Sequence, residues 1–236
     1  MWHVWECIKL KDRCDSWVQI DHHATNPCFA EENDVDGTVP ANCILVREML
    51  RVLEIPLNRE ISMCLYAGLS TDTGNFAFAS TTPETFRVMS ELMENDLPLQ
   101  DLNRILFREK AKEQVKLIGR AIAGLRFLCD GKLAVMTLTQ KDFEECEALP
   151  EHADTIVNVG LDTTGTKMAL LCRENGDGTV KASLRAVPPY RINGIAKAFG
   201  GGGHAQASGI TMQGELAEVT DRVAEAMVNA LTGNEE

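Results

Sequence analysis

The chain has 236 residues and a mass of 26.0 kDa, which is enough for two modest domains that each bury a core. Hydrophobic residues make up 44% of it and charged residues 25%, and no apolar run approaches the length of a membrane span. The formal charge of −12 argues against binding to long nucleic acid, which needs many cations to contact the phosphates. A short anionic substrate would need its own local cluster of cations.

The first residues and the cysteines bear on location and redox state. The first residues lack the basic and then apolar layout of a signal peptide, so we expect a cytoplasmic protein with no membrane partner. None of the eight cysteines forms a C-x-x-C pair, the spacing of zinc ribbons and redox motifs. We expect free thiols, several of them buried in apolar segments, such as Cys43, Cys64 and Cys172.

A short apolar run at residues 17–20 predicts a buried strand that ends at Asp21, His22 and His23. Open parallel sheets bind their ligands past the carboxyl ends of strands, where these side chains would lie. Because neighbouring side chains leave a strand on opposite faces, Asp21 and His23 should point one way and His22 the other. The pattern predicts one imidazole bound to a metal, with the other two side chains orienting it or touching substrate. A surface turn with two unrelated histidines is the alternative.

Helical patterns follow in the first half of the chain. Residues 31–37 are rich in charge and turn formers and predict a loop. Residues 41–53, 59–69 and 83–94 predict helices, two of them with a clear buried stripe. Asp72 lies in the polar run after the second helix. On its own this aspartate would be a cap or turn residue, and it becomes a candidate ligand only if a metal is bound nearby.

The pattern stays helical over residues 102–125, with a dense charged face, and this stretch is the predicted linker between two domains. The charge run itself is typical of a solvated helix face. Beyond it, residues 133–138 predict a strand. The character of the sequence therefore changes at the linker.

Two further strands, residues 167–172 and 180–187, flank Asn175-Gly176-Asp177-Gly178, which is a strong hairpin signal. The second of these strands alternates, with one apolar face for the core. Its other face carries a hydroxyl and two cations: Lys181, Ser183 and Arg185.

Four glycines, residues 200–203, stand directly before His204 and between two apolar stretches. Residues 192–199 predict a short amphipathic helix, and residues 204–208 could start another. Glycines let the backbone approach a ligand with its N–H groups turned inward, and a helix N-terminus adds partial positive charge. The pattern predicts an anion site with His204 as a donor. A flexible glycine linker is the alternative, and the flanking apolar structure disfavours it.

Three motifs in this order resemble the DHH phosphoesterase family: Asp21-His22-His23, Ser70-Thr71-Asp72-Thr73-Gly74 and Gly201-Gly202-Gly203-His204. Within the family, the similarity is closest to the bifunctional nano-RNase and 3′,5′-adenosine-bisphosphate (pAp) phosphatase branch. It covers about residues 15–213 with compatible spacing. Each motif alone is a weak signal, whereas the ordered set is a strong one.

The resemblance implies an α/β enzyme: a parallel-sheet DHH domain over residues 1–104, a helical linker over 105–125, and a smaller α/β DHH-associated domain over 126–236. It implies hydrolysis of phosphoester bonds in short oligonucleotides (nano-RNA), in pAp or in both, at a two-metal site that holds Mn²⁺, with Mg²⁺ as the alternative. The implied partners are therefore a short oligonucleotide or a nucleotide bisphosphate, and not a long nucleic acid.

The resemblance also implies roles for single residues. His22 and Asp72 match metal ligands, His23 matches the histidine beside the scissile phosphate, and Asp21 matches the residue that orients the site. The implied substrate-binding residues in the second domain are Arg173, Ser183, Arg185, Gly201, Gly202, Gly203 and His204.

The chain departs from the family before its first motif. Family members carry there an Asp-x-Asp motif and a further aspartate that complete the two-manganese site; this chain contains neither, and residues 9–13 resemble the stretch just after that second aspartate. We therefore expect an N-terminally truncated enzyme, or a natural fragment of one. Because His22 and Asp72 alone cannot build a two-metal site, we expect very poor hydrolysis even with manganese. Missing strands would also expose a sheet edge, which allows a homodimer.

Two other functions remain open at this point. One is a cyclic-dinucleotide phosphodiesterase or a RecJ-like exonuclease, which the acidic charge and the absence of extra domains disfavour. The other is a catalytically dead nucleotide-binding module that keeps the phosphate cradle of the second domain.

Overall fold

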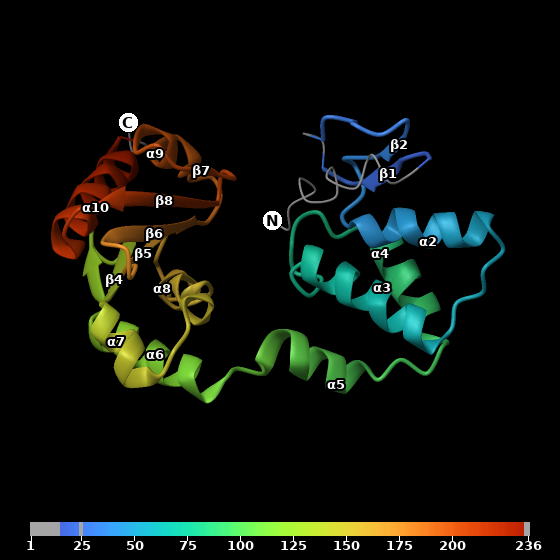
Figure 1. The fold of residues 1–236 in the computed structure, drawn as a ribbon, viewed down its shortest axis with the longest axis horizontal. Helices are drawn as coiled ribbons and strands as arrows, with labels where there is room; N and C mark the ends of the chain where they lie inside the picture. The colour runs from blue at the N-terminus through green and yellow to red at the C-terminus, as the bar shows by residue number, and fades with distance from the viewer. Residues whose placement is uncertain (1–14, 24–25, 234–236) are drawn as a thin grey trace. The chain divides into compact units, whose positions relative to one another are not determined.

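The computed structural model describes residues 15–23 and 26–233 and divides into two compact units, residues 1–109 and 110–236. The stretch at residues 9–13 that resembles the family lies outside the described residues. No helix in the described ranges is both long enough and apolar enough to cross a lipid bilayer. Figure 1 shows the helices and strands of each unit.

The first unit begins with a two-stranded parallel sheet. Its elements in order are β1 (Val18–Asp21), β2 (Glu32–Val35), α2 (Asn42–Val52), α3 (Arg59–Asp72), α4 (Pro83–Met93), α5 (Leu99–Asn103) and the π-helical turn η2 (Arg104–Arg108). Strands β1 and β2 are parallel, as predicted for this domain. The expected loop at residues 31–37 instead contains β2. Its side chains are polar and mostly exposed, so its pairing with β1 rests on backbone hydrogen bonds that the hydrophobic pattern does not reveal.

The three predicted helices are present, and they form the core of the first unit. Tyr66, Leu69 and Leu92 are fully buried where α2, α3 and α4 pack together (Figure 1). Asn58 caps α3 and Thr82 caps α4, each by accepting a backbone N–H through its side chain. Helix α3 is longer than predicted, because its last turn includes Asp72.

The expected continuous helix over residues 102–125 is wrong. Helices α5 and η2 end at Arg108, the backbone is extended at Glu109 and Ala111, and α6 (Lys112–Ala123) starts afresh. Glu109 and Lys110, which lie between the helices, are charged and exposed. This stretch therefore has no buried apolar face through which tertiary packing could keep it helical. Helix α6 buries Leu117 and Ala121 in the core of the second unit, and the division between the units falls inside the predicted linker.

The second unit is built on one mixed six-stranded sheet in the order β3-β4-β5-β6-β8-β7. After α6 its elements are β3 (Arg126–Leu128), β4 (Leu133–Leu138), α7 (Gln140–Cys146), the 3₁₀ turn η3 (Pro150–Ala153), α8 (Val157–Leu161), β5 (Met168–Glu174), β6 (Thr179–Ala186), α9 (Asn193–Ala198), β7 (Gly202–Gly203), β8 (Ala207–Gln213) and α10 (Leu216–Thr232). The β4–β5 pair is parallel and the other pairs are antiparallel. The predicted hairpin at residues 175–178 joins β5 to β6.

Both faces of this sheet are covered. One apolar cluster lies between the sheet and helices α9 and α10, and a second lies between the sheet and helices α6, α7 and α8 (Figure 1). Strand β6 alternates as predicted, with its apolar side chains buried toward the first cluster and its polar ones on the opposite face. All six described cysteines are free, although Cys64 is exposed rather than buried.

The expected helix at residues 204–208 is wrong. The chain turns at His204 and continues as β8, which pairs with β6 over residues 207–213. Ser208 and Ile210 are buried in this strand and alternate with less buried neighbours. The alternation places them on a sheet face, and the short run considered for a helix was too brief to show it.

Candidate metal centre and basic face

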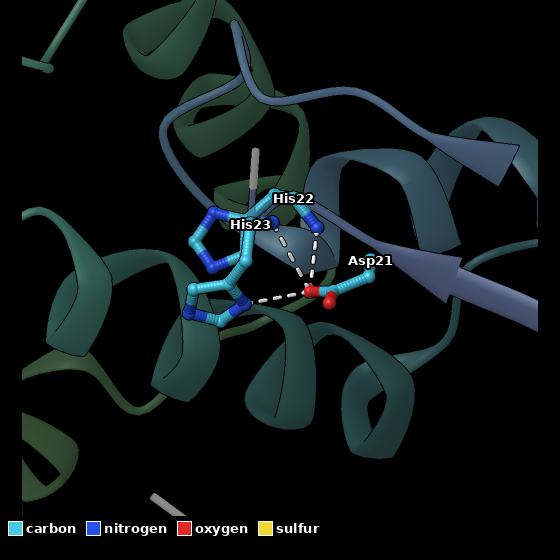
Figure 2. Close-up of side chains that lie close together, drawn as sticks. All are labelled: Asp21, His22 and His23. Atoms are coloured by element: carbon cyan, nitrogen blue, oxygen red, sulfur yellow. Dashed lines mark hydrogen bonds and ion pairs between the residues drawn. The ribbon is translucent and has the colours of Figure 1, made fainter. Parts of the chain in front are cut away.

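Asp21 is the hub of the motif at the end of β1 (Figure 2). Its Oδ1 accepts the backbone N–H groups of His22 and His23 at 2.7 and 3.2 Å, and the ring Nδ1 of His23 lies 2.7 Å away. Its Oδ2 accepts a hydrogen bond from the side-chain amide of Asn26. Asp21 therefore holds the two residues that follow it and fixes the orientation of one imidazole.

These contacts keep Asp21 ionised. Burial would raise its pKa, but the hydrogen bonds from Asn26, His23 and the two backbone N–H groups outweigh burial and lower the pKa to about 2. The amide of Asn26 is itself held, because its Oδ1 accepts the backbone N–H of Cys28 at 2.8 Å. Asp21 is therefore a fixed acceptor for a protonated Nδ1 of His23, which leaves Nε2 of that ring free.

The two histidines lie closer together than strand alternation predicted. Their rings are edge to face with centroids 4.4 Å apart, and one ligand atom from each of Asp21, His22 and His23 lies within 4.8 Å of the others. Strand β1 ends at Asp21, so alternation no longer governs the two residues beyond it. The expectation that His22 points away from the other two is therefore wrong.

Asp72 comes to the same place from α3. Its Oδ2 lies 3.7 Å from Nε2 of His22, a separation that suits two donors on one ion at about 2.0–2.2 Å each. Asp72 is the last residue of the helix rather than an N-cap, and no basic residue lies in that last turn. A carboxylate at a helix C-terminus is unfavourable unless a cation lies nearby.

The donors present fit a divalent metal ion. An imidazole nitrogen and a carboxylate oxygen, with a second imidazole beside them, suit Mn²⁺ or Zn²⁺, and Mg²⁺ prefers a site richer in oxygen. His22 is mostly buried, with 16% of its side chain exposed, while Asp72 is 38% exposed and His23 55%. The pair of His22 and Asp72 would hold the ion, and His23 would face solvent or substrate.

The predicted substrate-binding side chains of the second unit share one face of its sheet. Arg173 lies opposite Lys181 across the β5–β6 pair, and Ser183 and Arg185 follow Lys181 on the same face of β6. Burial lowers the pKa of both Arg173 and Arg185, and the carboxylate of Asp154 offsets part of this effect. Asp154 is already paired with Lys181 at 3.2 Å.

The two guanidinium groups carry few anionic contacts. Arg173 donates to the side chain of Asn175 at 2.8 Å and lies 5.9 Å from the ring centre of Phe143. Arg185 donates to the carbonyl of Leu184 at 2.9 Å. A half-buried cation without a close carboxylate is costly, so this face suits an incoming anion.

The glycine loop is shaped by strand packing. A Cβ on Gly201 would lie 2.2 Å from the carbonyl oxygen of Gly209, and one on Gly203 would lie 2.5 Å from that of Ala207. Gly202 faces open space. Gly201 and Gly203 therefore have to be glycines for this stretch to approach β8. No helix begins after the glycines, so the helix N-terminus that was expected to strengthen an anion site here is absent.

His204 occupies the turn between β7 and β8. Its backbone N–H donates to the carbonyl of Ala207 at 2.8 Å, and its carbonyl accepts the hydroxyl of Ser208 at 2.9 Å. The residue is exposed. Gly202 and His204 therefore remain available to a ligand, and the close packing of Gly201 and Gly203 explains these glycines without one.

The second unit matches a known domain family. Residues 130–231 match the DHHA1 domain family. The chain contains a DHHA1 domain. This domain includes every substrate-binding residue that the sequence predicted.

Relatives match across both units. The chain is 33% identical to the bifunctional oligoribonuclease and PAP phosphatase NrnA of Thermus thermophilus over 91% of its own length and 64% of that protein. It is 26% identical to the protein of the same name from Bacillus subtilis, covering 83% of this chain and 62% of that one. The predicted resemblance to DHH phosphoesterases of this branch is confirmed. The chain spans about three fifths of the length of these relatives.

A solved structure supports the fold. The crystal structure of an exopolyphosphatase-related protein from Bacteroides fragilis superposes with a TM-score of 0.81 at 24% identity, over 92% of this chain and 63% of that one. The α/β fold of both units therefore agrees with the predicted fold class.

The structure thus brings the predicted residues together in two sets. Asp21, His22, His23 and Asp72 gather in the first unit, and the basic face and glycine turn belong to the DHHA1 domain. Sequence reasoning missed Asn26, because an asparagine before a proline is typical of a turn. Its spacing of five residues after Asp21 was the only signal. It also missed Asp154, whose role depends on its proximity to cations on other elements.

Proposed function

We propose that this chain is the metal-binding and substrate-binding part of a phosphoesterase that hydrolyses short oligonucleotides, pAp or both. The observation that carries the proposal is the position of the Asp72 carboxylate, 3.7 Å from Nε2 of His22. Asp72 ends a helix whose last turn contains no basic residue to compensate the carboxylate. The names of the relatives, oligoribonuclease and PAP phosphatase, support the choice of substrate.

The chain's own groups divide the work. A bound divalent ion would supply an activated water and neutralise phosphate oxygens. His22 and Asp72 would hold it, and Asp21 would keep a proton on Nδ1 of His23, so that Nε2 faces the phosphate. Within the second unit, Arg185 offers positive charge and His204 offers a hydrogen-bond donor to a phosphate. A short substrate fits a basic face of three cations on a chain whose formal charge is −12.

We also propose that turnover by this chain alone is slow. Within residues 15–23 and 26–233, the one cluster of three or more metal-competent side chains is that around Asp21, which supplies donors for a single ion. Family members are expected to use two ions. Turnover equal to that of the full-length Thermus thermophilus relative, measured side by side with Mn²⁺, would contradict this part of the proposal.

The test is hydrolysis of pAp, of a 5′-labelled diribonucleotide and of a long single-stranded RNA, each with Mn²⁺, Mg²⁺ or EDTA. We expect slow, Mn²⁺-dependent cleavage of the short substrates, abolished by Asp72→Asn and unchanged by Asp101→Asn, an exposed control on α5. Cleavage that survives EDTA or Asp72→Asn would refute the metal centre. Metal-independent binding of pAp without turnover would favour the nucleotide-binding module, and preference for long RNA would favour an exonuclease.

A further inference from the structure

An exposed aromatic ring stands beside the candidate metal centre. Phe78 is 57% exposed, and its ring rests on the backbone of Gly74, where an added Cβ would lie 2.4 Å from the ring. Gly74 is two residues beyond Asp72, and two residues span at most about 7 Å. The ring therefore lies against backbone within about 7 Å of the Cα of Asp72, and much of its surface is open to solvent.

The loop that carries this ring is held in an unusual conformation. Gly74, Asn75 and Phe76 all have positive φ, at 57°, 55° and 66°. The left-handed region is unfavourable for the two residues that are not glycine. Backbone hydrogen bonds hold the loop to the end of α3: the N–H of Asn75 donates to the carbonyl of Ser70 at 2.6 Å, and the N–H of Phe78 to that of Thr73 at 3.0 Å. The backbone that carries the ring is therefore held to the end of the helix that carries Asp72.

A neighbouring phenylalanine is exposed for a different reason. Phe86 is 56% exposed, but it stacks on Phe76, with ring centres 5.5 Å apart and planes at 26°. In the part of the chain that the structure describes, Phe78 makes no such ring contact. The exposed face of Phe78, next to a candidate site for a metal ion and a phosphate, suits a flat ligand group.

We infer that Phe78 stacks on the base of the nucleotide whose phosphate lies at the metal centre. This inference rests on the proposed function. Every nucleobase has a π-face, so stacking on a phenylalanine is tolerant of base identity. One sugar separates phosphate from base in a nucleotide, which suits the short separation between Asp72 and the backbone under the ring. The site therefore selects nucleotides over bare sugar phosphates, without reading the base.

The test compares the binding of pAp with that of its abasic analogue, 1-deoxyribose 3′,5′-bisphosphate, by calorimetry with Mn²⁺. Phe78→Ala is expected to weaken pAp by about 5- to 100-fold and to leave the abasic ligand unchanged. Phe78→Trp should retain its affinity for pAp. Phe78→Ala should also bind pCp more weakly than the wild-type chain does, because stacking does not depend on the base. The matched control is Phe86→Ala, which removes an equally exposed ring that does not lie on Gly74 and should leave both affinities unchanged.

The outcomes separate the two levels of the claim. Equal weakening of both ligands by Phe78→Ala, or no weakening of pAp, overturns the stacking role and leaves the proposed function standing. A wild-type chain that binds neither ligand overturns the proposed function and the inference with it. Melting temperatures of the three variants guard against a loss of fold.

Discussion

Asn26 shows how one amide can organise a charged site. It donates to Oδ2 of Asp21 and accepts the N–H of Cys28, so it cannot turn without breaking both contacts. Asp21 in turn receives Nδ1 of His23 on its other oxygen. Partners of this kind fix the tautomer and direction of an imidazole, although they touch neither metal nor substrate.

Replacing Asn26 by alanine should therefore impair the centre without unfolding the unit. We expect Mn²⁺ affinity or Mn²⁺-dependent turnover to fall by about 10- to 100-fold, because Asp21 loses the contact that fixes its second oxygen. Titration calorimetry measures the affinity. Asn33→Ala is the matched control, since the side chain of that exposed asparagine bonds to the backbone of Ala30 and not to Asp21. Equal effects of the two substitutions would show that Asn26 has no special role.

At the scale of elements, the β7–β8 turn explains why the glycines could be interpreted in two ways. Gly201 and Gly203 are glycines because β8 lies too close for a Cβ, whereas nothing lies within 4 Å of a Cβ on Gly202. A run of glycines in a sequence does not distinguish packing against a strand from packing against a ligand. The separate positions do, once the partner strand is known.

Two substitutions separate these roles. Gly201→Ala should cost about 1–3 kcal/mol of unfolding free energy, because its Cβ meets a backbone oxygen that cannot move aside. Gly202→Ala should change stability by less than about 0.5 kcal/mol and should weaken pAp binding if the turn contacts phosphate. Urea denaturation and calorimetry supply the two numbers. A stable Gly201→Ala variant would count against the close strand packing.

The β5–β6 hairpin should respond to pH through Asp177. Its carboxylate accepts the N–H and hydroxyl of Thr179 at 3.0 and 2.7 Å, and these bonds lower its pKa from the ordinary 3.8. A lowered folded-state pKa stabilises the hairpin above pH 3.8, and that stabilisation is lost as the pH falls below this value. Amide exchange at Thr179 should therefore quicken as the pH drops through this range, after correction for intrinsic rates, and Asp177→Ala should remove the dependence. A variant that keeps the same dependence would assign it to another group.

Hydrophobic patterns predicted most helices and strands because those elements bury a stripe or a face. The alternation of β6 and the buried stripes of α2 and α4 are examples. Two of the misses share a physical cause, since each depended on a partner distant in sequence. Strand β2 is polar and exists through its pairing with β1, and residues 207–208 belong to β8 through its pairing with β6. The approach of Asp72 to His22 could be suspected only from the resemblance.

At the scale of the whole molecule, the second unit has the parts of an independent domain. Two apolar clusters cover both faces of its sheet, and α6 contributes Leu117 and Ala121 to one of them. A fragment of residues 110–236 should therefore unfold cooperatively on its own. A fragment of residues 126–236, which lacks α6, should be markedly less stable, because about two buried side chains are lost with their cover. Equal melting temperatures would show that α6 does not belong to the DHHA1 domain.

The central claim is that the chain holds a divalent metal ion between His22 and Asp72. Its most direct test is Mn²⁺ binding to the purified chain, followed by electron paramagnetic resonance. We predict one bound ion per chain, with affinity reduced about 10-fold or more by His22→Ala and by Asp72→Asn and unaffected by Asp101→Asn. Mn²⁺ binding that is absent from the wild-type chain, or that is unchanged in both variants, would contradict the account.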